Sequence, residues 1–260
     1  MTISSADLIR NTVRSRYGKI ALERDRSTSS AGGCCTPTEA AKLGYADTDD
    51  TSVPTGANLG LGCGNPLAIA SLKPGQTVLD LGSGAGFDCF LAARAVGPTG
   101  RVIGVDMTHE MLQRARDNAR RGGYTQVEFR LGEIEALPVA DNSVDVVISN
   151  CVLNLSPEKL RVLTEAFRVL RPGGRVAVSD PVRTADLPPE IANDPSLYCA
   201  CASGAASIAE WEAWFHAAGF VDVRIRPKDE SREFIREWAP GSRVEEFVVS
   251  ATLEAVKPIP

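Results

Sequence analysis

The sequence predicts an α/β fold, a mostly parallel sheet with helices on both faces. From residue 67 onward, apolar runs typical of buried strands alternate with segments of helical periodicity. The first of these strands leads directly into a glycine-rich turn at 82–86, which opens the next helix. The chain has 260 residues, 43% of them hydrophobic, so it is long enough to bury one sizeable core.

The elements follow from periodicity and from the residues that bound them. A helix opens the chain, and a second one begins after Thr108, a residue type that caps helix N-termini. The last two strands have no clear crossover helix between them, so one of them is expected to run antiparallel. Strands are expected at 77–81, 101–106, 127–131, 144–149, 175–179, 221–226 and 246–253, and helices at 6–24, 88–96, 108–121, 157–170 and 207–218.

The chain divides by composition into two parts. Residues 1–64 are expected to form an N-terminal extension, a helix followed by a loop that carries cysteines. Within it, 45–64 is rich in Asp, Thr and Gly, which favours a loop. Residues 65–260 are expected to form the main α/β domain, with a segment near 181–206 covering the substrate.

Charge and hydropathy exclude several classes of protein. The net charge of −5 argues against nucleic acid as the main ligand, because phosphate binding favours a basic patch. No apolar run approaches the roughly 18 residues of a membrane span. Charged residues interrupt the N-terminal 25 residues, so no signal core is present. We therefore expect a cytoplasmic monomer with no membrane partner, in which seven cysteines serve as ligands, redox groups or core residues.

The glycine-rich turn indicates a nucleotide-like cofactor. Its spacing, Gly82-Ser83-Gly84-Ala85-Gly86, differs from the dinucleotide pattern because the third glycine comes one residue early. Asp106 ends the second strand, where a carboxylate accepts hydrogen bonds from ribose hydroxyls. Asp80 ends the first strand, where an anion would face a cationic group, such as the amino group or the sulfonium of S-adenosylmethionine. The alternative is that the glycines form only a tight turn.

Two further signals extend this pattern. Gly132-Glu133 follows the third strand, and Arg171-Pro172-Gly173-Gly174 precedes the fifth. The combined pattern resembles the Rossmann-like, S-adenosylmethionine-dependent methyltransferases, which implies seven strands in the order 3-2-1-4-5-7-6 with strand 7 antiparallel. By this resemblance Glu133 and Ile134 flank the adenine, and Asp106 and Met107 hold ribose and adenine. The expected cofactor-binding residues are Asp80, Gly82, Ser83, Gly84, Gly86, Asp106, Met107, Glu133, Ile134 and Asn150.

Three cysteines from distant segments are placed where they could meet. Cys151 follows the fourth strand, at the edge of a parallel sheet where ligands bind. Cys201 lies between the fifth strand and the next helix, and Cys63 stands between two glycines before the first strand. Three thiolates would make a trigonal pocket for a soft ion. Each cysteine has an alternative reading as a core residue, and zinc is the rival ligand, although Cys-x-x-Cys pairs are absent.

Several stretches together resemble the arsenite methyltransferases over nearly the whole chain. They are Gly60–Pro66, Gly82–Cys89, Gly132–Glu135, Ser149–Leu155 and Cys201–Ala205. The resemblance implies that Cys151 and Cys201 bind trivalent arsenic, that Cys63 is a third thiol, and that Cys34 or Cys35 joins thiol–disulfide steps. Some members carry two tyrosines where Gly60 and Leu61 stand here, which puts an aromatic contact with the cofactor in doubt. The role of Cys199 stays open.

This resemblance implies a reaction that needs no general base. Arsenite or methylarsenite bound by thiolates keeps a lone pair, which can attack the sulfonium methyl of S-adenosylmethionine. A disulfide between Cys63 and Cys34 or Cys35 would return arsenic to the trivalent state, and thioredoxin or glutathione would then reset the thiols. Two alternatives remain: a methyltransferase of a small organic acceptor, with incidental cysteines, and a metalloid-binding protein without catalysis.

Overall fold

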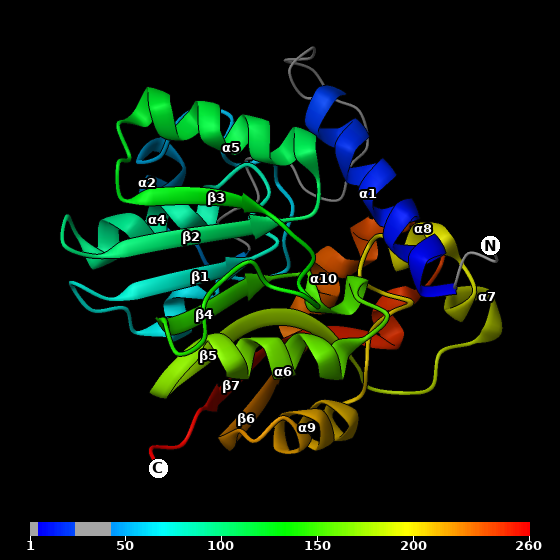
Figure 1. The fold of residues 1–260 in the computed structure, drawn as a ribbon. Coiled ribbons are helices and arrows are strands. Elements are labelled where there is room, and N and C mark those ends of the chain that lie inside the picture. Colours follow the sequence, from blue (N-terminus) through cyan, green and yellow to red (C-terminus); the bar gives the residue numbers. More distant parts are fainter. Residues whose placement is uncertain (1–4, 24–42) are drawn as a thin grey trace.

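The computed structural model describes residues 5–23 and 43–260, which form one seven-stranded sheet of order β3-β2-β1-β4-β5-β7-β6 (Figure 1). The first five strands are mutually parallel, and β7 runs antiparallel to both of its neighbours. This confirms the predicted fold class, strand order and antiparallel strand. The strands are β1 Thr77–Leu81, β2 Arg101–Asp106, β3 Val127–Leu131, β4 Val144–Asn150, β5 Leu170–Arg183, β6 Val221–Lys228 and β7 Val248–Val256.

Helices cover both faces of this sheet. Successive side chains of a strand point to opposite faces, so Leu79 and Leu81 pack into one core cluster and Val78 into the other. The first cluster includes residues of α6 and α9, and the second residues of α3, α4 and α5. The helices are α1 Ser5–Glu23, α2 Asp47–Thr51, α3 Leu67–Ala70, α4 Phe87–Val96, α5 His109–Gly122, α6 Lys159–Val169, α7 Pro189–Ala192, α8 Pro195–Tyr198, α9 Ile208–Ala217 and α10 Arg232–Ile235.

Two expectations about the elements need correction. The segment 45–64 is not loop throughout, because Asp47–Thr51 forms the short helix α2. The fifth strand is longer at both ends than 175–179, since β7 pairs with it as far as Arg183. Thr108 does stand at the N-cap of α5, yet its side chain makes no capping bond. Its amide donates instead to Asp106 at 2.8 Å.

The carboxyl ends of the parallel strands face α1 and the segment that follows β5. In Figure 1, α1 begins beside α7 and α8 and extends to the start of α5, across the side to which these strands point. Short helical turns between β6 and β7 pack against the segment 187–205 through Ile235, Val244 and Leu197. No helix in the described part of the chain is long and apolar enough to span a membrane.

Candidate active site

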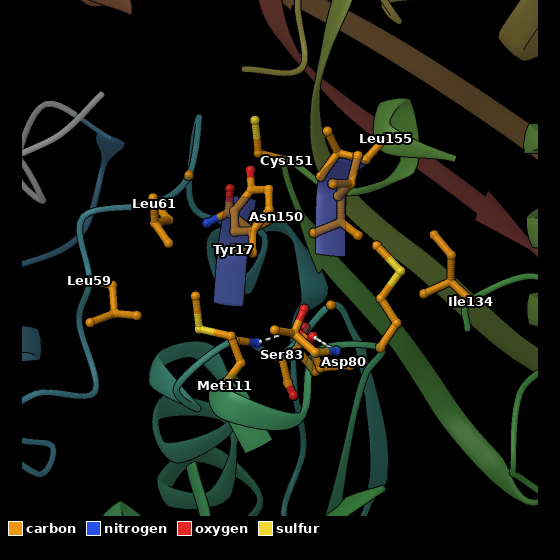
Figure 2. Close-up of a pocket in the computed structure, with 18 of the residues that line it drawn as sticks. Tyr17, Leu59, Leu61, Asp80, Ser83, Met111, Ile134, Asn150, Cys151 and Leu155 are labelled. Carbon is orange, nitrogen blue, oxygen red and sulfur yellow. Dashed lines mark hydrogen bonds between the residues drawn. The ribbon is translucent and has the colours of Figure 1, made fainter. Parts of the chain in front are cut away.

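A pocket opens at the carboxyl ends of β1, β2 and β4 (Figure 2). Its floor is the glycine-rich turn, and its wall on the β4 side carries Asn150 and Cys151. Helix α1 and the segment after α8 complete the lining. Of the residues expected at the site, the pocket is lined by Asp80, Gly82, Ser83, Gly84, Asp106, Met107, Ile134, Asn150, Cys151 and Cys201.

The glycine-rich turn is held by the carboxylate at the end of β2. The amide of Gly84 donates to Asp106 Oδ2 at 3.0 Å. A Cβ at Gly84 would meet no atom within 4 Å, so the backbone there is open to a ligand. The buried hydroxyl of Ser83 has no hydrogen-bond partner among the described residues. Such an unpaired group costs stability, which a polar ligand in the pocket would recover.

Gly86 has a different role from its neighbours. It does not line the pocket, and a Cβ there would come within 2.9 Å of the rings of Phe90 and Phe129. Its φ of 97° also lies in the region that favours glycine. The third glycine therefore permits the close packing of α4 against β3, beneath the turn.

Three buried carboxyl groups gather near this turn. Burial raises the pKa of Asp80, and the neighbouring Asp88 raises it further. Burial also raises the pKa of Asp106, and it raises that of Asp88 to about 6. The thiol of Cys89 donates to Asp80 at 3.2 Å. A cationic ligand would favour the ionised carboxylates, so the site suits the ammonium and sulfonium of S-adenosylmethionine.

A hydrogen-bond network joins these acids to the segment that carries Cys63. Asn150 Nδ2 donates to the hydroxyl of Tyr45 at 2.9 Å, and that hydroxyl donates to Asp88 at 2.6 Å. The same amide accepts, through Oδ1, from the main-chain N–H of Cys63 at 3.0 Å. Sequence reasoning did not identify Tyr45 or Asp88, since nothing near either residue indicates a partner so far along the chain.

The thiols of Cys63, Cys151 and Cys201 converge beside the acids. Hydrogen bonds with the thiols of Cys201 and Cys63 raise the pKa of Cys151, and burial adds to the effect. None of the three forms a disulfide with another residue in the described part of the chain. The thiol of Cys201 donates to the carbonyl of Cys151 at 2.8 Å, and that of Cys63 to the carbonyl of Ser179 at 3.4 Å.

This arrangement is a thiol cluster and not a formed metal site. Within 5–23 and 43–260, no group of three or more His, Cys, Asp or Glu side chains is arranged to hold a metal ion. Two of the thiols point at carbonyl oxygens and would have to rotate to share a ligand. Cys199 also lines the pocket, whereas Cys63 is buried behind it. Cys34 and Cys35 lie outside the described residues.

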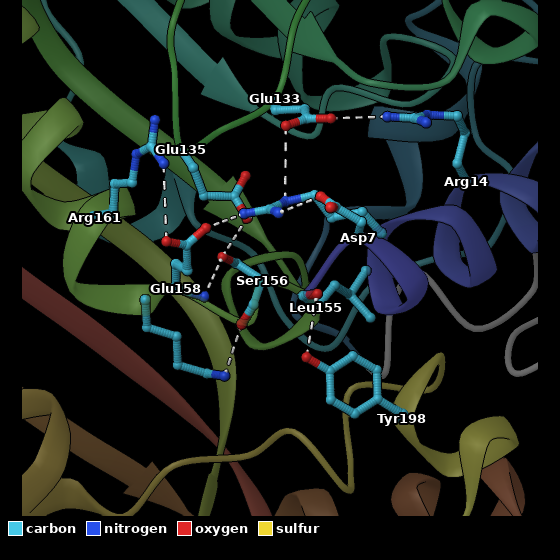
Figure 3. A network of polar contacts seen from close by, with 11 residues as sticks. Asp7, Arg14, Glu133, Glu135, Leu155, Ser156, Glu158, Arg161 and Tyr198 are labelled. Atoms are coloured by element: carbon cyan, nitrogen blue, oxygen red, sulfur yellow. Dashed lines mark hydrogen bonds and ion pairs between the residues drawn. The ribbon is translucent and has the colours of Figure 1, made fainter. Parts of the chain in front are cut away.

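Helix α1 closes the pocket through charged and aromatic side chains that the sequence did not single out. Arg10 lines the pocket and pairs with the buried Glu135 at 3.2 Å and with Glu158. Glu133 pairs with Arg14 at 2.9 Å, as Figure 3 shows, and does not line the pocket. The hydroxyl of Tyr17 donates to the carbonyl of Cys199 at 3.2 Å. The helix therefore touches both the cofactor side and the thiol side.

Comparisons with known proteins agree with this geometry. A methyltransferase-domain family model matches residues 72–219. The arsenite methyltransferase of Halobacterium salinarum is 55% identical over 96% of this chain and 66% of its own length. The human arsenite methyltransferase is 38% identical over 63% of this chain and 46% of its own length. The chain thus spans about half to two thirds of the length of the curated relatives it matches.

A solved structure extends the match to three dimensions. The crystal structure of an arsenic(III) S-adenosylmethionine methyltransferase from Chlamydomonas reinhardtii superposes with a TM-score of 0.63 and 31% identity. The match covers 96% of this chain and 74% of that one. The chain therefore belongs to the arsenite S-adenosylmethionine methyltransferase family.

Proposed function

We propose that the protein methylates trivalent arsenic, using S-adenosylmethionine as the methyl donor. The observation that carries this proposal is the convergence of Cys63, Cys151 and Cys201 beside a pocket lined by buried carboxylates. An incidental cysteine is most often an isolated core residue. Three thiols from segments 50 or more residues apart, meeting at the edge where ligands bind, favour a thiol-seeking substrate.

The residues of the pocket fit the cofactor. S-adenosylmethionine supplies an activated methyl group when it is bound. Asp106 would accept hydrogen bonds from the ribose, and Met107 and Ile134 would flank the adenine. Asp80 and Asp88 would balance the positive charges, and the unpaired hydroxyl of Ser83 would find a partner. Glu133 stays a predicted adenine neighbour, although its carboxylate pairs with α1.

The thiols would bind arsenic without a base. Each thiol proton leaves with one hydroxyl of arsenite as water, so three thiols release three waters and form three As–S bonds. Arsenic would keep its lone pair, which would form the bond to the transferred methyl group, while the electron pair of the broken sulfur–methyl bond would stay on the sulfur of the donor. The protein's part is to hold the reactants together and to exclude water, which can remove roughly 7–11 kcal/mol of a barrier when the geometry is good. The site needs no histidine for this chemistry.

A fourth thiol, acting with one of the three that bind arsenic, would complete the cycle. Methylation raises arsenic to the pentavalent state, and two electrons from two thiols return it to the trivalent state as a disulfide forms. We infer that Cys63 with Cys34 or Cys35 forms that disulfide, and that thioredoxin or glutathione reduces it. The cytoplasmic location and the monomeric state stay predictions from the sequence.

Arsenic speciation tests the proposal directly. Purified protein is incubated with arsenite, S-adenosylmethionine and excess thiol, and the products are separated by chromatography and identified by mass spectrometry. We expect methylated arsenic from the wild type and none from Cys151→Ser. Cys199→Ser is the matched control, because it makes the same change in the same pocket and should retain product.

Two outcomes would contradict the proposal. Methylation that survives Cys151→Ser would remove the thiol from the mechanism. A wild type that binds S-adenosylmethionine but forms no methylated arsenic would direct the search toward a small organic acceptor.

A further inference from the structure

The two pocket-lining cysteines of the cluster share an uncommon backbone conformation. Cys151 and Cys201 both have a φ of 60°, in the left-handed region that residues with a side chain rarely adopt. Such a conformation persists only where the surroundings hold it. The residues that hold these two cysteines are therefore part of the site, even if they do not touch arsenic.

Asp180 of β5 binds the main chain directly after Cys151. Its side chain is fully buried. Oδ2 accepts the main-chain N–H groups of Val152 at 2.9 Å and Leu153 at 2.8 Å. The N–H of Cys151 itself donates to the neighbouring carbonyl of Ser179 at 2.8 Å. Three successive amides after β4 are thus tied to β5, and they fix the turn from which the thiol of Cys151 projects.

Asn154 extends this connection to the segment that carries Cys201. Its Nδ2 donates to Asp180 Oδ1 and to the carbonyl of Pro181, both at 2.6 Å. Its Oδ1 accepts the N–H of Ala206 at 3.4 Å. Gly204 packs so tightly here that a Cβ would overlap the main-chain oxygen of Asn154. The buried Asn154 side chain therefore holds residues 204–206 against the turn after β4.

We propose that Asp180, acting through Asn154, is a positioning residue for arsenic: it fixes the turn of Cys151 against the segment of Cys201, so that the two cysteines lie side by side before arsenic binds and only a thiol rotation is needed to bridge them. The inference rests on the proposed function, since it assigns a role in the same site. The thiol of Cys201 donates a hydrogen bond to the carbonyl of Cys151, so the two segments are in direct contact.

The chemistry explains why prior alignment matters. A trivalent arsenical bonded to two thiols needs both sulfur atoms within reach at once. The two cysteines are 50 residues apart in sequence, so chain connectivity does not supply that proximity. Buried groups behind a ligand set its orientation, and their loss typically lowers affinity for the bound ion about 10- to 100-fold. Asp180 is such a buried group for both thiols, because it binds the turn of Cys151 directly and the segment of Cys201 through Asn154.

Phenylarsine oxide tests this inference without methyl transfer. It reacts with two thiols to form two As–S bonds and one water, and a competing dithiol removes it. The assay is run on the full chain with Cys34→Ser and Cys35→Ser, so that this vicinal pair does not bind the probe. Intact-mass measurement gives the amount bound, and peptide mapping shows whether Cys151 and Cys201 are bridged.

The test variant is Asp180→Asn, which keeps one acceptor but places N–H groups against the amide of Asn154. We expect the dithiol concentration that removes half of the probe to fall about 10- to 100-fold. Asp145→Asn is the matched control. Asp145 accepts the amide of Thr77 at 2.7 Å near the start of β4, at the opposite strand end from Cys151. It should leave that concentration unchanged.

Two further readouts separate positioning from a general loss of structure. The affinity for S-adenosylmethionine, measured by calorimetry, and the rate at which iodoacetamide alkylates the thiol of Cys151 should both stay at the wild-type value in Asp180→Asn, whereas a general loss of structure would lower the affinity and raise the rate. Should that variant fail to fold, Asn154→Ala replaces it, because it keeps the two main-chain amide bonds to Asp180 and removes the bonds that the Asn154 side chain makes to Asp180, Pro181 and Ala206. The same loss of the bridged arsenical is then expected.

The inference is overturned if a folded variant retains the probe as the wild type does, or if the wild type fails to bridge Cys151 and Cys201. It is also overturned if cofactor affinity falls in parallel with probe retention, which would mean a general loosening. A wild type that bridges the two thiols but methylates no arsenic would refute the proposed function alone and leave the positioning role standing.

Discussion

Substituting Arg10 should open the helix that covers the pocket. The Arg10 side chain is only 12% exposed, and its guanidinium lies 3.2 Å from Glu135, which is 5% exposed. Its other partners, Asp7, Glu133 and Glu158, are 58%, 39% and 41% exposed, so solvent screens those pairs. Arg10→Met keeps the aliphatic length, removes the charge, and leaves the carboxylate of Glu135 with the hydroxyl of Ser156, which donates to it at 2.6 Å.

The magnitude follows from these exposures. The screened pairs contribute about 0–1 kcal/mol each. The buried pair with Glu135 contributes about 2–3 kcal/mol, in the range of hydrogen bonds to charged groups. Since about 1.4 kcal/mol corresponds to a factor of ten, the open state of α1 should become roughly 30- to 150-fold more populated. The opening should stay local, because the core clusters on the two sheet faces do not include Arg10.

Hydrogen exchange measured by mass spectrometry would detect this opening. Amides of α1 should exchange faster in Arg10→Met, while those of β1 and β4 keep their protection. S-adenosylmethionine should also dissociate faster, since α1 lines the pocket. Lys19→Met is the matched control, because Lys19 is an exposed cation on the same helix. Unchanged exchange in α1 would refute the estimate, and faster exchange with an unchanged rate of cofactor dissociation would refute the role of α1 as a cover.

Four further predictions concern the acids and the turn. Burial raises the pKa of Asp88 to about 6, so this carboxylate is protonated as the pH drops through about 6 and the affinity for the cationic cofactor should fall. Asp88→Asn should abolish that pH dependence in calorimetry. In the protein without cofactor, folding stability depends on pH in the opposite direction. The raised pKa of Asp88 stabilises the fold below the ordinary value of 3.8, and this contribution is lost as the pH rises through about 6. Thermal unfolding at several pH values would show the loss. Tyr45→Phe removes a hydrogen bond that lowers the pKa of Asp88, so the pH midpoint of cofactor binding should move upward; an unchanged midpoint would contradict the network. Gly86→Ala should destabilise the protein by about 1–3 kcal/mol in denaturant titration, because the added Cβ would lie 2.8 Å from the Phe90 ring at a positive φ; a loss near zero would contradict the packing argument.

The sequence predicts strands well where burial on both faces leaves a continuous apolar run. The bounds of β1, β2 and β3 agree with prediction to the residue. The fifth strand was predicted too short because its last residues, Asp180 to Arg183, owe their extended conformation to pairing with β7. Local periodicity carries no information about that pairing. The short helix α2 was missed for a related reason, since five polar residues show no periodicity.

The residues of the candidate site show the same distinction between local sequence signals and long-range contacts. Residues fixed by a motif, such as Gly84, Asp106 and Cys151, stand at the carboxyl edge of the sheet, where the order of elements placed them. Residues recruited by tertiary contact were not identified. Arg10 meets Glu135 across 125 residues, and Tyr45 meets Asn150 across 105. No spacing rule reaches so far, so these partners emerge only once the chain is folded.

Hydrogen bonds with the neighbouring thiols, together with burial, give Cys151 a chemical property that the sequence does not show. The raised pKa of Cys151 keeps its thiol protonated at neutral pH, and a protonated thiol is a poor nucleophile toward oxidants and alkylating agents. Arsenite is not excluded by this state, because its hydroxyls accept the thiol protons and leave as water. The pocket therefore holds the thiol of Cys151 in a form that discriminates between substrate and competing electrophiles. The same enclosure, with α1 above and β5 behind, both protects the cluster and aligns it.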